Sequence, residues 1–307
     1  MLVSGKSVLQ KAQEGRYAVG AFNVNNLEIL RAVIEAAVEK KSPVFIQTSE
    51  GAIDYAGIEY LSRMIKVAAK APVSVVMHLD HGKKLKYVRQ AIRHGYTSVM
   101  MDASHLSYED NISITQKVVA LASKKWVSVE AELGMIKGVE DKVSVDEKDA
   151  ILTHPDQAAD FVARTGCDSL AVAIGTSHGA FKFKQSPKLD IDRLGQIRSK
   201  VSLPLVLHGA SAVSPKMVEI ACRYGAVLPD MMGNSDEEVV AAVRGGVCKV
   251  NIDTDLRLAF CAGVREYLAQ HPSEIDPRKF MSLAKTYMKE IVMGKMDLLG
   301  SANKINN

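Results

Sequence analysis

The chain has 307 residues and carries 39 Lys and Arg against 35 Asp and Glu, a formal net charge of +4. Hydrophobic residues make up 47% of the sequence and charged residues 24%, as in ordinary globular proteins, which excludes disordered and collagen-like classes. The positive charges are spread along the chain without a basic run, so nucleic-acid binding has no support. A large buried core and a small anionic substrate are both compatible with this composition.

The cysteines indicate a reducing compartment. Cys167, Cys222, Cys248 and Cys261 lie far apart and form no CxxC pair, so we expect them to be buried thiols. The N-terminal residues carry charge where a signal peptide needs an apolar core, and no stretch is long and apolar enough to span a membrane. We therefore expect a cytoplasmic protein with no membrane partner.

Short apolar runs rich in Val, Ile and Ala recur along the chain, and each has the length of a strand. They cover residues 17–23, 43–48, 73–79, 97–101, 127–132, 168–174, 204–208 and 247–251. Their apolar character is continuous rather than alternating, which indicates strands buried on both faces of a parallel sheet.

Segments with helical periodicity lie between these runs. They cover residues 27–40, 60–70, 85–94, 111–124, 155–165, 191–200 and 215–224. The alternation predicts an α/β protein, a closed (β/α)8 or TIM barrel, as a single domain over residues 1–307. A doubly wound open sheet is the alternative, but no GxGxxG follows the first run.

Three stretches depart from a minimal barrel. Residues 134–149 form a polar stretch, and a connection of that length is uncommon unless it is functional. Residues 228–245 are an extra segment that begins without a motif we can place. Residues 278–300 have helical periodicity and predict a C-terminal helical extension past the eighth strand–helix unit.

Polar side chains gather at the C-terminal ends of six consecutive predicted strands, the end where barrel enzymes hold their active sites. Any one of them is more often a helix cap or a hydrogen-bonded core residue. Histidines at three separate strand ends are harder to explain in that way, because imidazoles at one barrel mouth can converge on a single zinc ion. We expect the ligands to be His81, His178 and His208, with Asp102 and Glu132 close by.

Glycines flank the proposed ligands at positions 175, 179 and 209. Small residues let backbone N–H groups approach an anion, as in the phosphate sites that follow strands seven and eight of many barrels. Lys182 would add a positive charge. Together with NIDTD after the eighth run, these turns predict a phosphate site beside the metal.

A series of motifs now stands out in chain order: AVGAFNVNN, HLDHG, SVMMDASH, VEAELG, VDEKDA, AIGTSHGAFK, LVLHGASA, KVNIDTDLRLAF and LLGSAN. In order and spacing they resemble the class II, metal-dependent fructose-1,6-bisphosphate aldolases, over essentially the whole chain. The tagatose-1,6-bisphosphate aldolases share most of these motifs.

The resemblance implies the same three histidines as zinc ligands. It implies that Asp80 is the acid/base that handles the C4 hydroxyl proton and that Glu147 is a mobile catalytic glutamate. Asp102 and Glu132 match positions that orient the ligands or hold zinc in a second, buried position. A monovalent cation is a further cofactor to expect.

Substrate contacts are implied in the same way. They are Asn23, Ser49, Gly179, Lys182, Gly209, Ser211, Asn251, Asp253 and Thr254. Arg278 matches an arginine that reaches the far phosphate of a neighbouring subunit's substrate. The expected assembly is therefore a homo-oligomer, a dimer or a tetramer.

The implied activity is zinc-dependent, reversible cleavage of fructose 1,6-bisphosphate to dihydroxyacetone phosphate and glyceraldehyde 3-phosphate. The tagatose enzyme is the nearest alternative, and a zinc hydrolase or a non-catalytic sugar-phosphate binder on the same barrel are more distant ones. Aldol cleavage through a Schiff-base lysine is disfavoured because the sixth and seventh runs contain no lysine. Lys249 is the one inward candidate in the later strands, and the sequence leaves its direction open.

Overall fold

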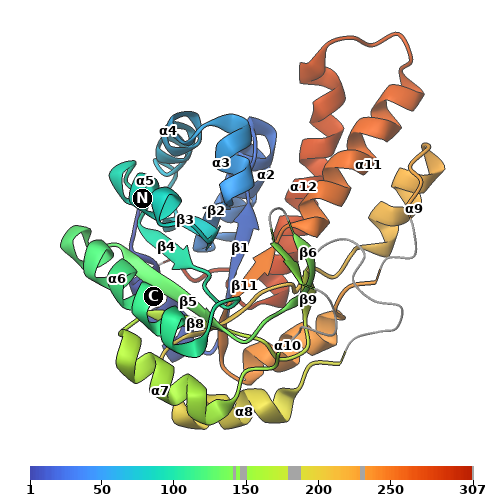
Figure 1. Ribbon diagram of the computed structural model, residues 1–307. Coiled ribbons are helices and arrows are strands. Elements are labelled where there is room, and N and C mark those ends of the chain that lie inside the picture. The colour runs from blue at the N-terminus through green and yellow to red at the C-terminus, as the bar shows by residue number, and fades with distance from the viewer. Residues whose placement is uncertain (141–142, 146–150, 179–187, 229–231, 306–307) are drawn as a thin grey trace.

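The computed structural model describes residues 1–140, 143–145, 151–178, 188–228 and 232–305, without the side chains of 137–140, 143–145 and 178. Eight parallel strands close into a barrel (Figure 1), which confirms the predicted fold class. In barrel order they are β1 Val19–Asn23, β2 Val44–Thr48, β3 Val75–Gly82, β4 Ser98–Met101, β5 Ser128–Leu133, β8 Ser169–Val172, β10 Leu205–Leu207 and β11 Val247–Ile252. Each coincides with a predicted run, and continuous burial along these strands agrees with their unbroken apolar character.

Helices surround the barrel on its outer face (Figure 1). They are α2 Leu27–Lys40, α4 Ile58–Ala68, α5 Leu85–Arg93, α6 Tyr108–Ala122, α7 Pro155–Thr165, α8 Ile191–Lys200, α9 Pro215–Arg223 and α10 Asp236–Arg244. The predictions for α2, α7 and α8 match to the residue, since an Asn, a Pro or an Asp begins each of these helices. Four of the described helices escaped the sequence analysis: α1 Gly5–Gly15, α3 Glu50–Ala56, α10 and α11 Thr254–Gln270.

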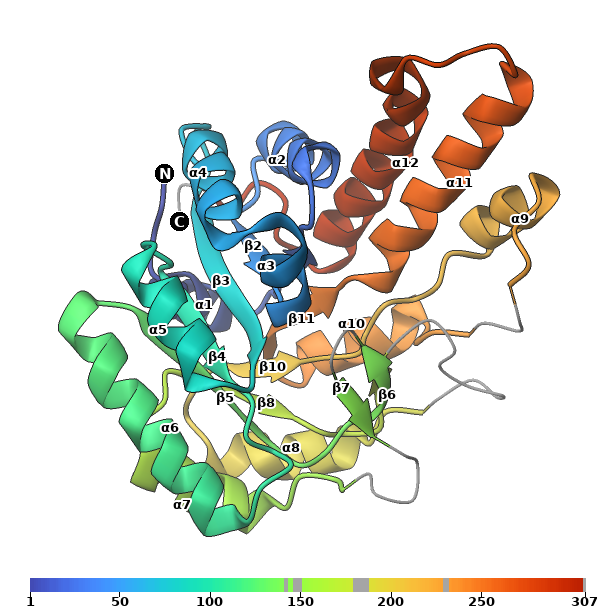
Figure 2. The same cartoon turned by 45° about the horizontal axis from the view of Figure 1, so that its top comes forward.

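The polar stretch after β5 is partly ordered as strands. β6 Lys137–Glu140 pairs antiparallel with β7 Val143–Val145 and parallel with β9 Ser177–His178, so these strands form a small second sheet. Figure 2 shows β6 and β7 beside the barrel, next to β8 and β10. The described part of this polar stretch therefore contains strands that the sequence analysis did not predict.

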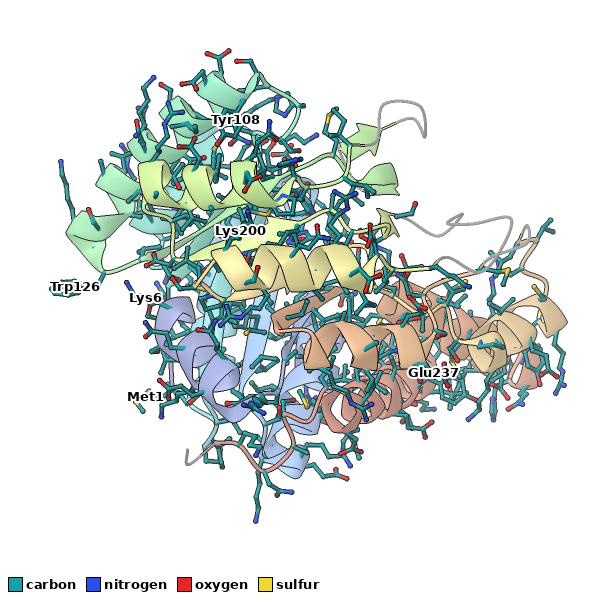
Figure 3. All side chains as sticks on the ribbon, turned by 90° about the horizontal axis from the view of Figure 1, so that it is seen from below. Met1, Lys6, Tyr108, Trp126, Lys200 and Glu237 are labelled. Carbon is teal, nitrogen blue, oxygen red and sulfur yellow. The ribbon has the colours of Figure 1, made fainter. Side chains whose placement is uncertain are left out.

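The α1 helix covers the end of the barrel where the strands begin. Val8, Leu9 and Ala12 of this helix pack with the interior side chains Val19 and Phe45 in one apolar cluster. In the view from below, Lys6 of α1 and Trp126, two residues before β5, lie on the same side of the molecule (Figure 3). The chemistry must therefore reach solvent at the opposite end.

The predicted C-terminal extension is present as α12 Pro277–Leu298. It packs against α11 as a helical hairpin that projects away from the barrel (Figure 2). Arg278 lies at the outer end of this hairpin and its side chain is 88% exposed. It therefore does not join the strand ends of its own barrel.

All four cysteines are free thiols, but only Cys167 and Cys248 are buried. Cys222 is exposed on α9 and Cys261 is half-buried on α11, so the expectation of four buried thiols is wrong for these two. An amphipathic surface helix has one face exposed to solvent, and a cysteine on that face is exposed.

Every helix in the described ranges is too short or too polar to cross a membrane.

Candidate metal and phosphate site

The end of β3 brings two consecutive side chains into the barrel mouth. Between the pairs Leu79–Val99 and Gly82–Met101, the register shifts by one residue, so Asp80 and His81 stand where β4 has a single residue. His81 has φ +44°, a left-handed conformation that is rare for a residue with a Cβ and that clusters at functional sites. The bulge lets both side chains point inward, where a regular strand would turn one of them away.

His81 meets His208, which follows β10 on the other side of the mouth. Nε2 of His81 lies 2.8 Å from Nδ1 of His208, and the two rings meet edge to face. Ligand atoms of Asp80, His81 and His208 lie within 4.8 Å of one another. The structure thus brings together three residues that the sequence assigned to the site.

The hydrogen bonds of the two rings show that this cluster accommodates a cation. Nδ1 of His81 lies 3.0 Å from the carboxylate of Asp102, and Nε2 of His208 lies 2.8 Å from that of Glu130. Because a carboxylate only accepts, these ring nitrogens donate, and the facing Nε2 and Nδ1 carry lone pairs. Two lone pairs 2.8 Å apart repel each other unless a proton or a metal ion lies between them. The two nitrogens are therefore suited to bind a metal ion.

The charges around His81 are unusual for a buried histidine. Burial by itself would lower its pKa, but the neighbouring carboxylates, Asp80 foremost, outweigh burial and raise the pKa of His81 to about 10. The surrounding carboxylates therefore favour a positive charge on the His81 ring, the same sign of charge that a metal ion would bring.

A second group of potential ligands shares His81. Ligand atoms of His81, Asp102 and Glu132 lie within 4.8 Å of one another, and all three residues are buried. Oε2 of Glu132 has no hydrogen-bond partner among the described atoms. Burial, followed by the charge of Asp102, raises the pKa of Glu132 well above its usual value. A divalent cation at this position would satisfy the orphaned oxygen.

Asp80 is held by two amides that reach it across the barrel mouth from β1 and β11. Asn23 Nδ2 donates to one carboxylate oxygen at 2.9 Å and Asn251 Nδ2 to the other at 3.0 Å. Gln47 donates to Asn23 Oδ1 at 2.6 Å and orients that amide in turn. These contacts fix the direction of the carboxylate.

Beneath the histidines lies a layer of buried charge inside the barrel. Lys249 is 0% exposed and its Nζ lies 2.9 Å from Oε2 of Glu130, which is 1% exposed. Burial alone would raise the pKa of Glu130, but Lys249 and the hydrogen bond from His208 outweigh burial and lower it. Lys249 therefore points inward, which answers the question left open by the sequence, and it is tied up in an ion pair.

The turn after β10 lies against the start of α11. Gly209 has φ +62°, and a Cβ there would lie 2.6 Å from the carbonyl oxygen of Ser177, so only glycine fits. Ser211 Oγ accepts the N–H of Asp253 at 3.4 Å. Thr254 begins α11, whose N-terminal N–H groups and positive dipole end favour an anion. Four of the predicted substrate contacts, Gly209, Ser211, Asp253 and Thr254, thus lie on two adjacent segments.

Sequence reasoning missed two residues beside this turn. Asn234 is buried and donates to the carbonyl of Gly209 at 2.9 Å, although it lies in the segment to which no motif was assigned. Arg257 makes a two-point ion pair with Asp253, at 2.6 and 2.9 Å. Arg257 stands one helical turn after Asp253 in a quoted motif, and that spacing was the available signal.

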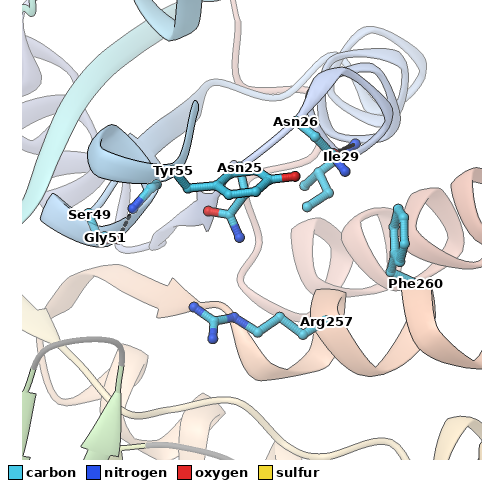
Figure 4. A pocket seen from close by; sticks show the side chains of 9 residues that line it. Asn25, Asn26, Ile29, Ser49, Gly51, Tyr55, Arg257 and Phe260 are labelled. Carbon is cyan, nitrogen blue, oxygen red and sulfur yellow. Dashed lines mark hydrogen bonds between the residues drawn. The ribbon is translucent and has the colours of Figure 1, made fainter. Parts of the chain in front are cut away.

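Arg257 lines a pocket of about 400 Å³ next to the barrel mouth. Figure 4 shows its guanidinium group reaching from α11 into the space beneath Asn25 and Tyr55. Ser49 lies at the same pocket, and its hydroxyl caps α3 by accepting the N–H of Ala52. The pocket therefore offers one cation and several polar groups to an anionic ligand.

The remaining predicted site residues are either outside the described part of the chain or remote from the barrel mouth. The side chain of His178, at the end of β9, and all of Gly179, Lys182 and Glu147 lie outside the described residues. Arg278 belongs to the outer end of the α11–α12 hairpin, where it pairs with Asp276 at 2.7 Å.

A (β/α)8 barrel whose mouth brings histidines and carboxylates close enough to share a metal ion has the architecture of a metal-dependent barrel enzyme. The family model described as fructose-bisphosphate aldolase class-II matches residues 3–304. The chain belongs to this family, which confirms the resemblance seen in the sequence.

Two curated relatives and one solved structure agree with this family assignment. The chain is 49% identical over 307 residues to a fructose-bisphosphate aldolase from Helicobacter pylori, covering 99% of this chain and 100% of that one. It is 48% identical over 304 residues to one from Thermus caldophilus, with coverage of 99% and 100%. The crystal structure of the YdjI aldolase from Escherichia coli K12 matches with a TM-score of 0.80 and 34% identity, over 99% of this chain and 100% of that one.

Proposed function

We propose that this chain, as one barrel domain, catalyses the zinc-dependent, reversible cleavage of fructose 1,6-bisphosphate to dihydroxyacetone phosphate and glyceraldehyde 3-phosphate. The observation that carries the proposal is the convergence of Asp80, His81 and His208 within 4.8 Å, at the mouth of a barrel of the class II aldolase family. His178 completes the proposed ligand set. Asp102 and Glu132 orient His81 or hold the metal in a second, deeper position, and a monovalent cation is a further proposed cofactor.

Asp80 acts as the base in this proposal. Asn23 and Asn251 hold its two oxygens in place, beside the proposed ligand His81. Removal of the C4 hydroxyl proton by Asp80 lets a carbonyl form at C4 as the C3–C4 bond breaks. The electron pair of that bond passes to the ketone half as an enediolate, and Glu147 is the proposed acid that returns a proton to it.

When bound, a divalent metal supplies Lewis acidity that stabilises negative charge developing on the ketone oxygen. The chain's own contribution is a fixed donor set in a buried mouth, where electrostatic interactions are strong. Lys249 is a poor candidate for the alternative Schiff-base route, because it is fully buried and paired with Glu130.

The two phosphates of the substrate have separate proposed positions. The proposed binding site for the dihydroxyacetone phosphate half consists of Gly179, Lys182, Gly209, Ser211, Asn251, Asp253 and Thr254. Ser49 and Arg257 bind the far phosphate, because their pocket carries an arginine within reach of a ligand in the mouth. Arg278 adds a contact from a neighbouring subunit in a homo-oligomer, since in its own chain it is remote and exposed. We propose a cytoplasmic setting.

The test is a coupled assay of dihydroxyacetone phosphate release from fructose 1,6-bisphosphate and, in parallel, from tagatose 1,6-bisphosphate. Each is measured before EDTA treatment, after it and after zinc is restored. We expect EDTA-sensitive, zinc-restored cleavage that prefers the fructose substrate. Preference for the tagatose substrate would keep the site and change the sugar.

Activity that survives EDTA but is lost on borohydride trapping would contradict the metal mechanism. A chain that releases no dihydroxyacetone phosphate from either sugar would leave a hydrolase or a binding protein as the better description.

A further inference from the structure

The ion pair of Glu130 and Lys249 lies inside the barrel, directly behind a proposed metal ligand. The two residues come from β5 and β11, which are separated in the barrel by β8 and β10, so the pair spans the interior. Lys249 Nζ lies 2.9 and 3.2 Å from the two oxygens of Glu130 and 3.5 Å from Nε2 of His78. Both side chains are removed from solvent.

Glu130 reaches His208 with one carboxylate oxygen. Oε1 lies 2.8 Å from Nε2 of His208, whose other nitrogen, Nδ1, faces His81. A neutral imidazole has one donor and one acceptor nitrogen, and a carboxylate can only accept. The contact with Glu130 therefore places the ring proton on Nε2 and leaves the lone pair of Nδ1 directed into the mouth.

Stability alone is a poor explanation for this pair. Other buried strand positions carry apolar side chains, such as the cluster of Met100, Ala171 and Val206. Replacing a buried ion pair by apolar residues of similar volume is often neutral or stabilising, because two charges are costly to remove from water. A charge pair kept at this depth is better explained by what it does to the ring of His208.

Lys249 has a defined part in that arrangement. A buried carboxylate needs a compensating charge, and the ammonium group of Lys249 supplies it. Its contacts with both oxygens also set the plane of the carboxylate, so that Oε1 is presented to His208.

We propose that Glu130 and Lys249 are a positioning pair that holds His208 in the tautomer and orientation in which Nδ1 faces the metal. The inference rests on the metal-dependent function proposed above. Carboxylates behind a ligating histidine typically affect metal affinity by about 10- to 100-fold, which sets the size of the expected effect.

The experiment compares Glu130→Gln, Lys249→Met and the double variant with the wild-type chain. Metal-free protein is titrated with Co²⁺ against a competing chelator, and the visible absorption bands of bound Co²⁺ are recorded. Urea unfolding of each metal-free protein is measured in parallel. Ser42→Ala is the matched control, because it removes a buried hydrogen bond to Ser301 and contacts neither the pair nor His208.

Each single variant should lose stability, because it leaves one buried charge without its partner. The double variant should recover stability, since both charges are gone, yet bind Co²⁺ roughly 10- to 100-fold more weakly with altered bands. Ser42→Ala should bind Co²⁺ with wild-type affinity and unchanged bands.

A double variant with wild-type Co²⁺ affinity and spectrum would overturn the inference and leave the pair a purely structural role. Glu130→Asp is a second route, because it keeps both charges but draws the carboxylate back from His208. Its affinity should also fall, and wild-type affinity there would overturn the inference even if the double variant does not fold. A wild-type chain that binds no Co²⁺ would instead overturn the metal site itself.

Discussion

The two ends of the barrel interior are filled by opposite kinds of side chain, although both are buried. Where the strands begin, Leu9 of α1 and Phe45 of β2 belong to an apolar cluster. Where the strands end, Asp80, His81 and His208 face one another. Burial at the first end stabilises the fold through the hydrophobic effect, whereas burial at the second strengthens every electrostatic interaction.

Between these ends lies the layer of Glu130 and Lys249, where charge first enters the interior. The same strands pass through all three layers. The apolar cluster and the polar group nevertheless have no residue in common, so a change at one end need not disturb the other. Four substitutions test how separate the ends are, from the largest expected effect to the smallest.

Asp80→Asn should lower kcat for fructose 1,6-bisphosphate cleavage by roughly 10²- to 10⁴-fold, because an amide cannot take the C4 hydroxyl proton. The free energy of unfolding and the amount of bound zinc, measured by urea unfolding and by metal analysis, should stay near wild type. Asp192→Asn, an exposed change on α8, is the control and should leave kcat unchanged. An Asp80→Asn enzyme with wild-type kcat would remove Asp80 from its role as base.

Leu9→Ala should lower stability and leave catalysis unchanged, the reverse of Asp80→Asn. It leaves a cavity at the apolar end and should lower the free energy of unfolding by roughly 2–5 kcal/mol, with kcat unchanged. Urea unfolding and the coupled assay measure the two quantities. Gln10→Ala, on the exposed face of the same helix, is the control and should change neither. If Leu9→Ala lowered kcat in folded protein, the two ends would be coupled.

Arg257→Ala should lower kcat/KM for the bisphosphate by about 10- to 100-fold, because a charge-assisted contact to a phosphate is lost. Arg257→Lys should recover part of the loss, since it keeps the charge but not the two-point geometry. Arg265→Ala, farther along α11, serves as the control. Equal kcat/KM for Arg257→Ala and wild type would mean that the far phosphate binds elsewhere.

Ser107→Ala should have the smallest effect, a loss of about 1 kcal/mol in the free energy of unfolding with no change in kcat. Ser107 caps α6 by accepting the N–H of Asp110, at the same end of the barrel as the site. Thermal or urea unfolding measures the loss, and Ser107→Asp should avoid it because aspartate is an equally good cap. A fall in kcat would show that this cap also supports the site.

The local pattern of apolar and capping residues was enough to predict the strands and most of the helices of the barrel. Strands buried on both faces must be apolar throughout, and caps such as Asn26 and Asp190 mark where helices begin, so the barrel could be predicted element by element. The short α3 helix escaped because a single turn or two has too little periodicity to detect. The polar segment that forms β6 and β7 gave no apolar signal, since its strands pair outside the core.

The candidate site was predictable only in part. Asp80, His81 and His208 were expected at strand ends, and the structure brings them together. The partners that orient them were not, because Glu130 and Lys249 meet across the barrel from strands far apart in sequence. Asn234 was missed for the same reason: its contact with Gly209 has no local signature.

By itself the sequence determined the alternation of strands and helices, the end of the barrel that carries polar chemistry, and the family. These follow from local composition and spacing, which act over a few residues. Tertiary structure decided the inward direction of Lys249, the bulge that turns both Asp80 and His81 into the mouth, and the placement of Arg257 in a pocket with Ser49. Each of these depends on strand register and barrel closure, which bring distant residues within a few ångströms and leave no trace in local pattern.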